Sequence, residues 1–350
     1  MAWTGGDFYI CGIGARTAVG TSAAASAAAV RAGISALALH PVFVDQEYEP
    51  VSFASDPVLE PDVPVADRML RMSRSVAAEA LSAGGSAGPV SIDRCWLALP
   101  ERRRGMPAHI GAHLATAVAE DLGMRSQAVH TLARGHAGGL MALQLAAEAI
   151  SRAEVDVALV IGVDSYHDAG TIASLDMRRR LMSARNRSGF PPGEGGGACL
   201  LASAGAVRRH RLRALAGIRS AATAVEQHPL RSTEPCLGDG LTAALSAAMA
   251  GLNVPQELIT ATYCNLNGER YRNEEFLYAL MRTQDRFVDP HDYISPADCW
   301  GDVGAASGPL FAVLAIAASL RGYAKGTYPL LWAGSDSGYR SAVTLALAEN

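Results

Sequence analysis

Runs of apolar residues alternate along the chain with alanine-rich stretches in which apolar residues recur at helical spacing. Short apolar runs predict buried strands, and the longer alanine-rich stretches predict helices. We expect strands at residues 8–13, 94–99, 127–130, 155–162, 198–202, 214–222, 258–264, 328–332 and 342–347. We expect helices at residues 22–32, 108–122, 138–152, 240–250, 274–282 and 304–320. Because strands and helices alternate, the pattern predicts an α/β fold whose sheet is largely parallel and covered by helices on both faces.

The order of strands and helices is similar in the two parts of the chain. At 350 residues the chain is longer than one ordinary core requires. Two similar series of elements indicate an internal duplication. The sequence therefore predicts two α/β halves, residues 1–205 and residues 206–350.

Composition narrows the classes of partner. Apolar residues make up 49% of the chain and charged residues 18%, which is typical of a protein with a large core. The formal net charge of −4 argues against a nucleic-acid partner. No apolar run reaches the roughly 20 residues of a membrane-spanning helix, and no secretory signal is expected at the start. These features predict a cytoplasmic protein without a membrane partner.

The chain offers little to a metal or a nucleotide cofactor. Its six cysteines are scattered and form no CxxC pair, so we expect reduced thiols and neither a disulfide framework nor a zinc site. His109 and His113 have helical i,i+4 spacing but lack the glutamate of a metalloprotease helix. The glycines of GIGARTAVG (12–20) lack the spacing of a dinucleotide fold. We therefore predict no metal and no cofactor. The arginine-rich stretches 102–104, 178–187 and 208–213 are interpreted as solvated faces or loop anchors, with contact to an acidic partner as the alternative.

One stretch, GFPPGEGGGACLL at residues 189–201, combines prolines, glycines and a glutamate in front of an apolar run. Pro191 and Pro192 hold an extended approach, and Glu194 is suited to hold a loop by hydrogen bonds. Glycines 195–197 carry no side chains and leave room for another backbone or a ligand. Locally, the stretch predicts a tight loop before a buried strand.

This stretch also resembles the GFVPGEGAGALVL segment of β-ketoacyl synthases, the condensing enzymes of the thiolase fold. Further similar segments follow in the family's order: FYICGIGARTAVG (8–20), LMALQLAAEAI (140–150), VDVALVIGVDS (155–165), SPADCWGDVGAASG (295–308) and WAGSDSGYRSAVTLAL (332–347). The resemblance spans residues 8–348. It implies a thiolase-like fold with two duplicated α/β halves in five layers, α-β-α-β-α, and an acyltransferase of fatty acid or polyketide biosynthesis.

The resemblance also locates the family's three catalytic positions, and all three differ here. The family's nucleophilic cysteine falls on His136, within ARGHAGGLMALQLA (133–146). Its first histidine falls on Cys264, or on Asn265 if the register slips by one. Its second histidine, from an NIGH motif, falls on Asp302. The glycine-rich gate of the family falls on the segment that contains Asp336.

A ketosynthase that lacks the thiol and both imidazoles is not expected to perform decarboxylative condensation. The resemblance then implies a pseudoenzyme that binds an acyl chain, acyl-CoA or an acyl carrier protein, or pairs with an active ketosynthase as chain-length factors do. The family dimerises through the strand before the nucleophile, here residues 127–132. A homodimer, or a heterodimer with an active ketosynthase, is therefore implied.

The alternative is an altered acyltransferase or thioesterase. If the three family positions converge, Cys264, His136 and Asp302 would supply a thiol, its base and an orienting carboxylate. Gly138 and Gly139 would offer N–H groups to an oxyanion.

Further substrate-binding candidates are Glu194, Asn265 and Asp336. The three candidate catalytic residues also have purely structural explanations. Cys264 has the character of a buried small hydrophobe, His136 of a helix cap, and Asp302 of the N-cap of the helix that begins at residue 304.

Overall fold

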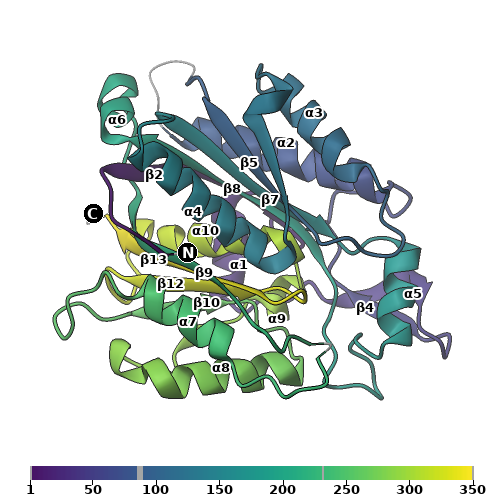
Figure 1. Ribbon diagram of the computed structural model, residues 1–350. Helices are drawn as coiled ribbons and strands as arrows, with labels where there is room; N and C mark the ends of the chain where they lie inside the picture. The colour runs from purple at the N-terminus through teal and green to yellow at the C-terminus, as the bar shows by residue number, and fades with distance from the viewer. Residues whose placement is uncertain (1, 85–89, 231, 349–350) are drawn as a thin grey trace.

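The computed structural model describes residues 2–84, 90–230 and 232–348 (Figure 1). The main feature of these residues is an 11-stranded sheet in the order β11-β10-β12-β13-β9-β2-β8-β7-β5-β6, with β1 paired to β9. The strands of the first half are β2 (Phe8–Thr17), β5 (Arg94–Leu99), β6 (Val129–Ala133), β7 (Val157–Ser165) and β8 (Glu194–Ser203). Those of the second half are β9 (Ala216–Val225), β10 (Ala261–Cys264), β11 (Tyr293–Ile294), β12 (Pro329–Gly334) and β13 (Tyr339–Leu347).

Each half has the same strand order. Counted along the chain within each half, the order across the sheet is third, second, fourth, fifth, first. The directions also agree, because the second strand of each half pairs in parallel with the third and fourth, and the fifth pairs antiparallel with the fourth and first. The predicted duplication is therefore present in the topology. The division at residue 205 falls in α6 (Ala204–His210) and stays a prediction.

The expectation of a largely parallel sheet is wrong, because parallel and antiparallel pairings are mixed in both halves. The reason is clearest at β12 and β13. They are joined by a short turn in which Ser335 N donates to Tyr339 O at 2.8 Å. Such a turn can connect only antiparallel neighbours. The two halves are joined in the sheet by the register pair of Ile10 in β2 with Ala216 in β9 and by the antiparallel pairing of β1 with β9.

Helices complete the five layers that the family resemblance implies (Figure 1). Between the two halves of the sheet lie α1 (Ala23–Arg31), α4 (Gly138–Ser151) and α10 (Ser307–Leu320). The outer face of the first half is covered by α2 (Val65–Ala83) and α3 (Ile110–Asp121), and that of the second by α7 (Asp239–Ala248) and α8 (Arg270–Thr283). The thiolase-like, five-layer fold is thus confirmed.

Several elements lie outside the predicted ones. The largest is α2, although its apolar positions Val65, Met69, Met72 and Val76 recur at helical spacing and are buried. The others are β1 (Ala2–Thr4), the hairpin β3 (Ala38–Val44) and β4 (Pro50–Phe53), α5 (Ala169–Met177), α6, α9 (Ala297–Trp300) and the short edge strand β11. The predicted strand at 127–130 begins two residues later, because residues 126–128 form a 3-10 turn.

The glycine-rich stretch 194–197 is part of β8 and not a loop before it, which corrects the local prediction. The glycines serve a close approach, as expected. A Cβ on Gly197 would lie 2.9 Å from the backbone nitrogen of Leu310 in α10. The middle-layer helix can therefore cross β8 at backbone distance. Of the helices in the described ranges, none combines the length and apolar character needed to cross a membrane.

Candidate functional site

The site is built around the starts of the two middle-layer helices. Each helix has 14 residues and follows a three-residue 3-10 turn, η2 (Gly135–Ala137) before α4 and η4 (Gly304–Ala306) before α10. Each turn opens with a glycine at positive φ, 59° at Gly135 and 48° at Gly304. The helices cross at their second residues, since a Cβ on Gly308 would lie 2.6 Å from the carbonyl carbon of Gly139.

A pocket of about 420 Å³ opens at the start of α4. Two of the predicted site residues, His136 and Asp336, line it. The lining also contains the arginines Arg102, Arg103, Arg104, Arg178 and Arg180. None of the six cysteines, all of which lie in the described ranges, is part of this lining.

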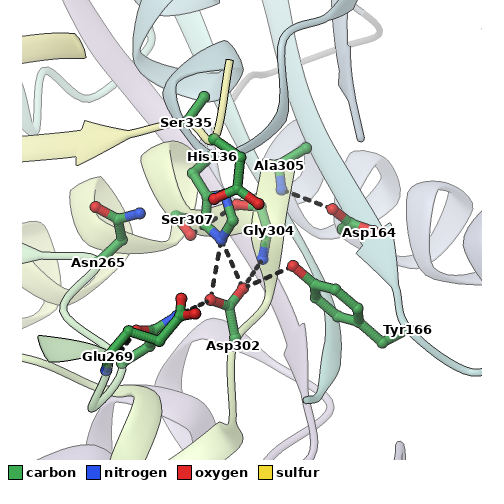
Figure 2. A network of polar contacts seen from close by, with 12 residues as sticks. His136, Asp164, Tyr166, Asn265, Glu269, Asp302, Gly304, Ala305, Ser307 and Ser335 are labelled. Atoms are coloured by element: carbon green, nitrogen blue, oxygen red, sulfur yellow. Dashed lines mark hydrogen bonds and ion pairs between the residues drawn. The ribbon is translucent and has the colours of Figure 1, made fainter. Parts of the chain in front are cut away.

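Asp302 is the centre of a polar network that reaches the pocket through two lining residues, His136 and Tyr166 (Figure 2). His136 Nε2 lies 2.7 Å from Asp302 Oδ1 and 3.0 Å from Oδ2. Asn267 Nδ2 donates to Oδ2 at 2.6 Å, and the Tyr166 hydroxyl donates to Oδ1 at 3.2 Å. The backbone N–H of Gly304 donates to Oδ1 at 2.9 Å. Asp302 thus joins the turn before α4 to the turn before α10.

The electrostatics of the network favour a charged Asp302. Burial by itself would raise the pKa of Asp302, but the charge and hydrogen bond of His136, the nearby Arg272 and the amide of Asn267 hold it well below its usual range. Burial raises the pKa of Tyr166 well above that of a free phenol, and the charge of Asp302 raises it further. The phenol therefore stays a neutral hydrogen-bond donor to a carboxylate.

The proline–glycine stretch holds the backbone of Asp302. Asp302 N donates to Pro191 O at 2.7 Å, and Gly193 N donates to Asp302 O at 2.9 Å. Gly301, directly before Asp302, has a φ of 71° and packs on Gly193, where a side chain on either residue would collide with backbone. The stretch 189–201, which resembles a segment of β-ketoacyl synthases, therefore holds the carboxylate of Asp302 in position.

Glu194 does not line the pocket and is fully buried. Its carboxylate forms an ion pair with Arg68, accepts a hydrogen bond from Asp56 N at 2.8 Å and accepts another from the Ser165 hydroxyl at 2.7 Å. The structure thus shows Glu194 connecting three segments, without contact to the pocket.

A second ionic cluster forms the pocket wall next to Asp336. Arg180 makes two hydrogen bonds of 2.7 Å to Glu269 and an ion pair with Asp336. Arg272 and the hydroxyl of Tyr271 each lie 3.0 Å from Asp336 Oδ1. Burial would raise the pKa of Asp336, but the two arginines hold it well below its usual range. Asp336 lines the pocket as a charged and fully engaged group.

Cys264 and Asn265 lie at the end of β10 and border a small cavity beside Asp302. The Cys264 thiol donates to Ile294 O at 3.7 Å, and burial raises its pKa to about 12. Within the described ranges, no hydrogen bond joins this thiol to His136 or Asp302. Asn265 pairs with the backbone of Gly334 through two hydrogen bonds of 3.0 Å.

The N–H groups at the two helix starts are bound by side chains from the opposite halves. Ala137 N donates to Ser335 Oγ at 2.9 Å, and Ala305 N donates to Asp164 Oδ2 at 3.0 Å. Gly138 N donates to the carbonyl oxygen of Gly135. Gly138 and Gly139, the predicted oxyanion donors, are not part of the pocket lining.

The arginine-rich stretches 102–104 and 178–187 contain both solvated arginines and arginines that anchor loops. Arg102, Arg104 and Arg178 are exposed, whereas Arg103 and Arg180 are anchored by carboxylates. The sequence did not predict that arginines of both stretches line the same pocket. It also missed Tyr166, Asn267, Asp164 and Glu269, which stand in loops or at strand ends. The polar residues after the buried strands ending at 165 and 264 are the pattern that could have identified them.

His109 and His113 are exposed at the start of α3. Among the described residues, one group has metal-ligand geometry, formed by Glu226, Cys236 and Glu275. Arg340 already pairs with Glu275, and Gly240 N donates to Glu226 at 2.8 Å. These contacts account for both carboxylates.

Comparisons with known proteins agree with the fold described above. Residues 98–206 match the family profile described as "Beta-ketoacyl synthase, N-terminal domain". No curated protein matches the chain in sequence.

Among solved structures, "The ishigamide ketosynthase/chain length factor" is similar with a TM-score of 0.78 and 18% identity, over 97% of this chain and 99% of that one. The ketosynthase from module 6 of the bacillaene synthase of Bacillus subtilis 168 has a TM-score of 0.77 and 15% identity, over 98% and 72% of the two chains. A chain of AntDE:AntF, described as a type II PKS acyl-carrier protein in complex with its ketosynthase bound to the hexaketide, has a TM-score of 0.77 and 15% identity, over 98% and 99%. Residues 98–206 therefore resemble the N-terminal domain of β-ketoacyl synthases, and the chain as a whole has the thiolase-like fold of these ketosynthase structures.

Proposed function

We propose that this protein is a non-condensing ketosynthase-like subunit that binds an acyl carrier protein or acyl-CoA and pairs with a second subunit, as chain-length factors do. One observation carries the proposal. The pocket at the start of α4 holds an imidazole that is bound to a buried carboxylate, and it holds no thiol.

The chemistry of condensation needs a thiolate that takes up the acyl group. In its place His136 is bound through Nε2 to Asp302. The nearest candidate thiol, Cys264, has a pKa of about 12 because of burial, so almost none of it is thiolate at neutral pH. Imidazole is also a poor lasting acyl carrier. The pocket is therefore suited to hold a thioester without forming an acyl-enzyme.

Charge at the pocket supports binding of a phosphorylated thioester. Arg102, Arg104 and Arg178 are exposed at the pocket and make no ion pair within the described ranges. Guanidinium groups recognise phosphate through paired N–H donors. The phosphate of a phosphopantetheine arm would lie at these arginines, with the thioester directed toward His136.

The arrangement of strands supports pairing with a second subunit. The first half ends at β6, which pairs on one side with β5 and presents its other edge. His130 and Thr131 on this strand are exposed. An open edge strand is a template for antiparallel pairing with another chain. We expect this edge to form the interface of a homodimer or of a heterodimer with an active ketosynthase.

The test of the non-condensing role uses intact mass spectrometry after incubation with acetyl-, octanoyl- and malonyl-CoA. We expect no covalent acyl adduct, no decarboxylation of malonyl-CoA and no faster hydrolysis than in buffer. An acyl adduct on Cys264 or His136, or malonyl decarboxylation, would contradict the proposal and favour the rearranged acyltransferase or thioesterase. Loss of that activity in Cys264→Ser, with His136→Gln inactive as well, would establish the rearranged site.

Binding and pairing are tested separately. Isothermal titration with octanoyl-CoA should show binding that weakens about tenfold or more in Arg178→Gln, the size of one lost charge-assisted contact. Arg208→Gln, on exposed α6, is the matched control and should bind as the unmodified chain does. Unchanged binding in Arg178→Gln would contradict the phosphate site.

Pairing is tested by sedimentation, which should show a dimer that Thr131→Lys dissociates.

A further inference from the structure

A second pocket of about 250 Å³ lies where α1 of the first half meets α10 and the edge formed by β10 and β11 of the second half. Its wall is largely apolar and includes Val30 of α1, Leu314 and Ala318 of α10, and Ile294 of β11. It shares no lining residue with the pocket at His136. The chamber therefore offers an apolar environment apart from the site already described.

Two phenol groups face this apolar wall. Tyr263 is 5% exposed and Tyr323 is half-buried, and both line the pocket. Neither hydroxyl has a hydrogen-bond partner within the described ranges. Burial raises the pKa of both phenols, so each remains a neutral donor. Both hydroxyls are therefore available to donate a hydrogen bond to a polar group of a molecule bound in the pocket.

The rim of the pocket carries excess positive charge. The Arg31 guanidinium lies over the Tyr323 ring, with its central carbon 3.9 Å from the ring centroid. It forms no ion pair with a carboxylate in the described ranges, and stacking leaves its N–H edge available. Lys325, also in the lining, is paired with Asp292. Within the lining, the uncompensated charge is therefore that of Arg31, and Arg321 acts on Tyr323 from outside the lining.

We propose that this pocket binds a monocarboxylate with a short apolar tail, with the tail in the chamber and the carboxylate at Arg31 and the two tyrosine hydroxyls. The chamber of about 250 Å³ is far larger than a single water molecule, whose share of liquid volume is about 30 Å³, and it has room for a chain of several carbons. A guanidinium and two neutral hydroxyl donors match the acceptor oxygens of a carboxylate, whereas the charge of Arg31 would repel an ammonium group.

The test is isothermal titration of the full chain with octanoate, and with octanol as the uncharged probe of the same length. We expect octanoate to bind and octanol to bind at least tenfold more weakly. Arg31→Gln should weaken octanoate about tenfold, the effect of one charge-assisted contact, and leave octanol unchanged. Arg208→Gln removes an equal exposed charge on α6, outside the lining, and should have no effect.

Two further variants place the ligand. Ala324→Trp fills the chamber and should abolish binding of both probes, with circular dichroism confirming the fold. Arg178→Gln, in the pocket at His136, should leave octanoate binding unchanged. The proposal is overturned if octanoate fails to bind at millimolar concentration, if octanol binds equally well, or if Arg178→Gln rather than Arg31→Gln weakens binding.

Discussion

The starts of α4 and α10 have the same local structure, yet the start of α4 lines the pocket of about 420 Å³ and the start of α10 lines only the small cavity beside Asp302. Both consist of a glycine at positive φ, a 3-10 turn and a helix of 14 residues. The second residue of the turn is His136 in the first half and Ala305 in the second. Each turn also donates an N–H to a side chain at the end of the other half's fourth strand.

The difference shows how a duplicated scaffold becomes a single site. Close crossing of the helices requires glycine at their second residues, so this part is the same in both halves. The polar pair of the site forms between the halves, because Asp302, just before the turn η4, contacts the imidazole of His136 in the turn η2. The arginines come from two segments of the first half, residues 102–104 after β5 and residues 178–180 after α5. Symmetry thus determines the framework, and the unequal loops determine the polar groups.

The helix crossing should give the largest effect. In Gly308→Ala the new Cβ would lie 2.5 Å from the backbone nitrogen of Leu140, so backbone must move. We expect the free energy of unfolding, from urea denaturation, to fall by about 3 kcal/mol. Gly205→Ala is the matched control, because it is also the second residue of a helix, and its Cβ would approach nothing closer than 3.6 Å. That control should change stability by less than about 1 kcal/mol. A cost below about 1 kcal/mol in Gly308→Ala would show that the crossing is loose.

The carboxylate at the second turn should give a smaller, pH-dependent effect. The pKa of Asp302 is lowered by folding, so its charge contributes stability above the unfolded pKa of about 4 and loses it as the pH falls below that value. Asp302→Asn should therefore reduce the free energy of unfolding by about 2 kcal/mol at pH 7 and by progressively less below about pH 4.

The pH profile distinguishes this electrostatic role from a purely steric one. Asp121→Asn, in an exposed ion pair with Arg74, should show no such profile. An equal loss at pH 7 and pH 3 in Asp302→Asn would indicate that shape, and not charge, is what the network requires.

The reciprocal contact at the first helix should give the smallest effect. Ser335→Ala removes the acceptor of Ala137 N, which is buried. We expect a loss of about 1 kcal/mol in the free energy of unfolding, the usual effect of one unsatisfied buried donor. Ser82→Ala, whose hydroxyl bonds to the backbone of an exposed helix face, should be neutral. Equal values for the two variants would mean that water replaces Ser335.

The sequence predicted the elements that pack on both sides better than those at the edges. Strands β5 and β7 and helices α4 and α10 carry continuous apolar runs, and their predicted bounds agree within a few residues. The hairpin β3–β4 and the two-residue strand β11 were not predicted, because Pro41 and Pro50 interrupt the strand pattern of the hairpin and β11 is too short to show a period. For the site, the resemblance selected His136 and Asp302, which lie beside each other in the structure, and Asp336, which lines the pocket, while their functional roles stay predictions. It could not show that Cys264 bonds away from them, because that depends on which face of β10 the thiol occupies.

By itself the sequence determined the α/β alternation, the likeness of the two halves and the residues that stand at the helix starts, because these follow from local periodicity and from motifs in order. Only the tertiary structure decided that His136 meets Asp302 across 166 residues, that arginines from two distant stretches line one pocket, and that the sheet is mixed. Such contacts depend on strand order and on how closely two helices cross. Neither quantity is written in the period of a single segment.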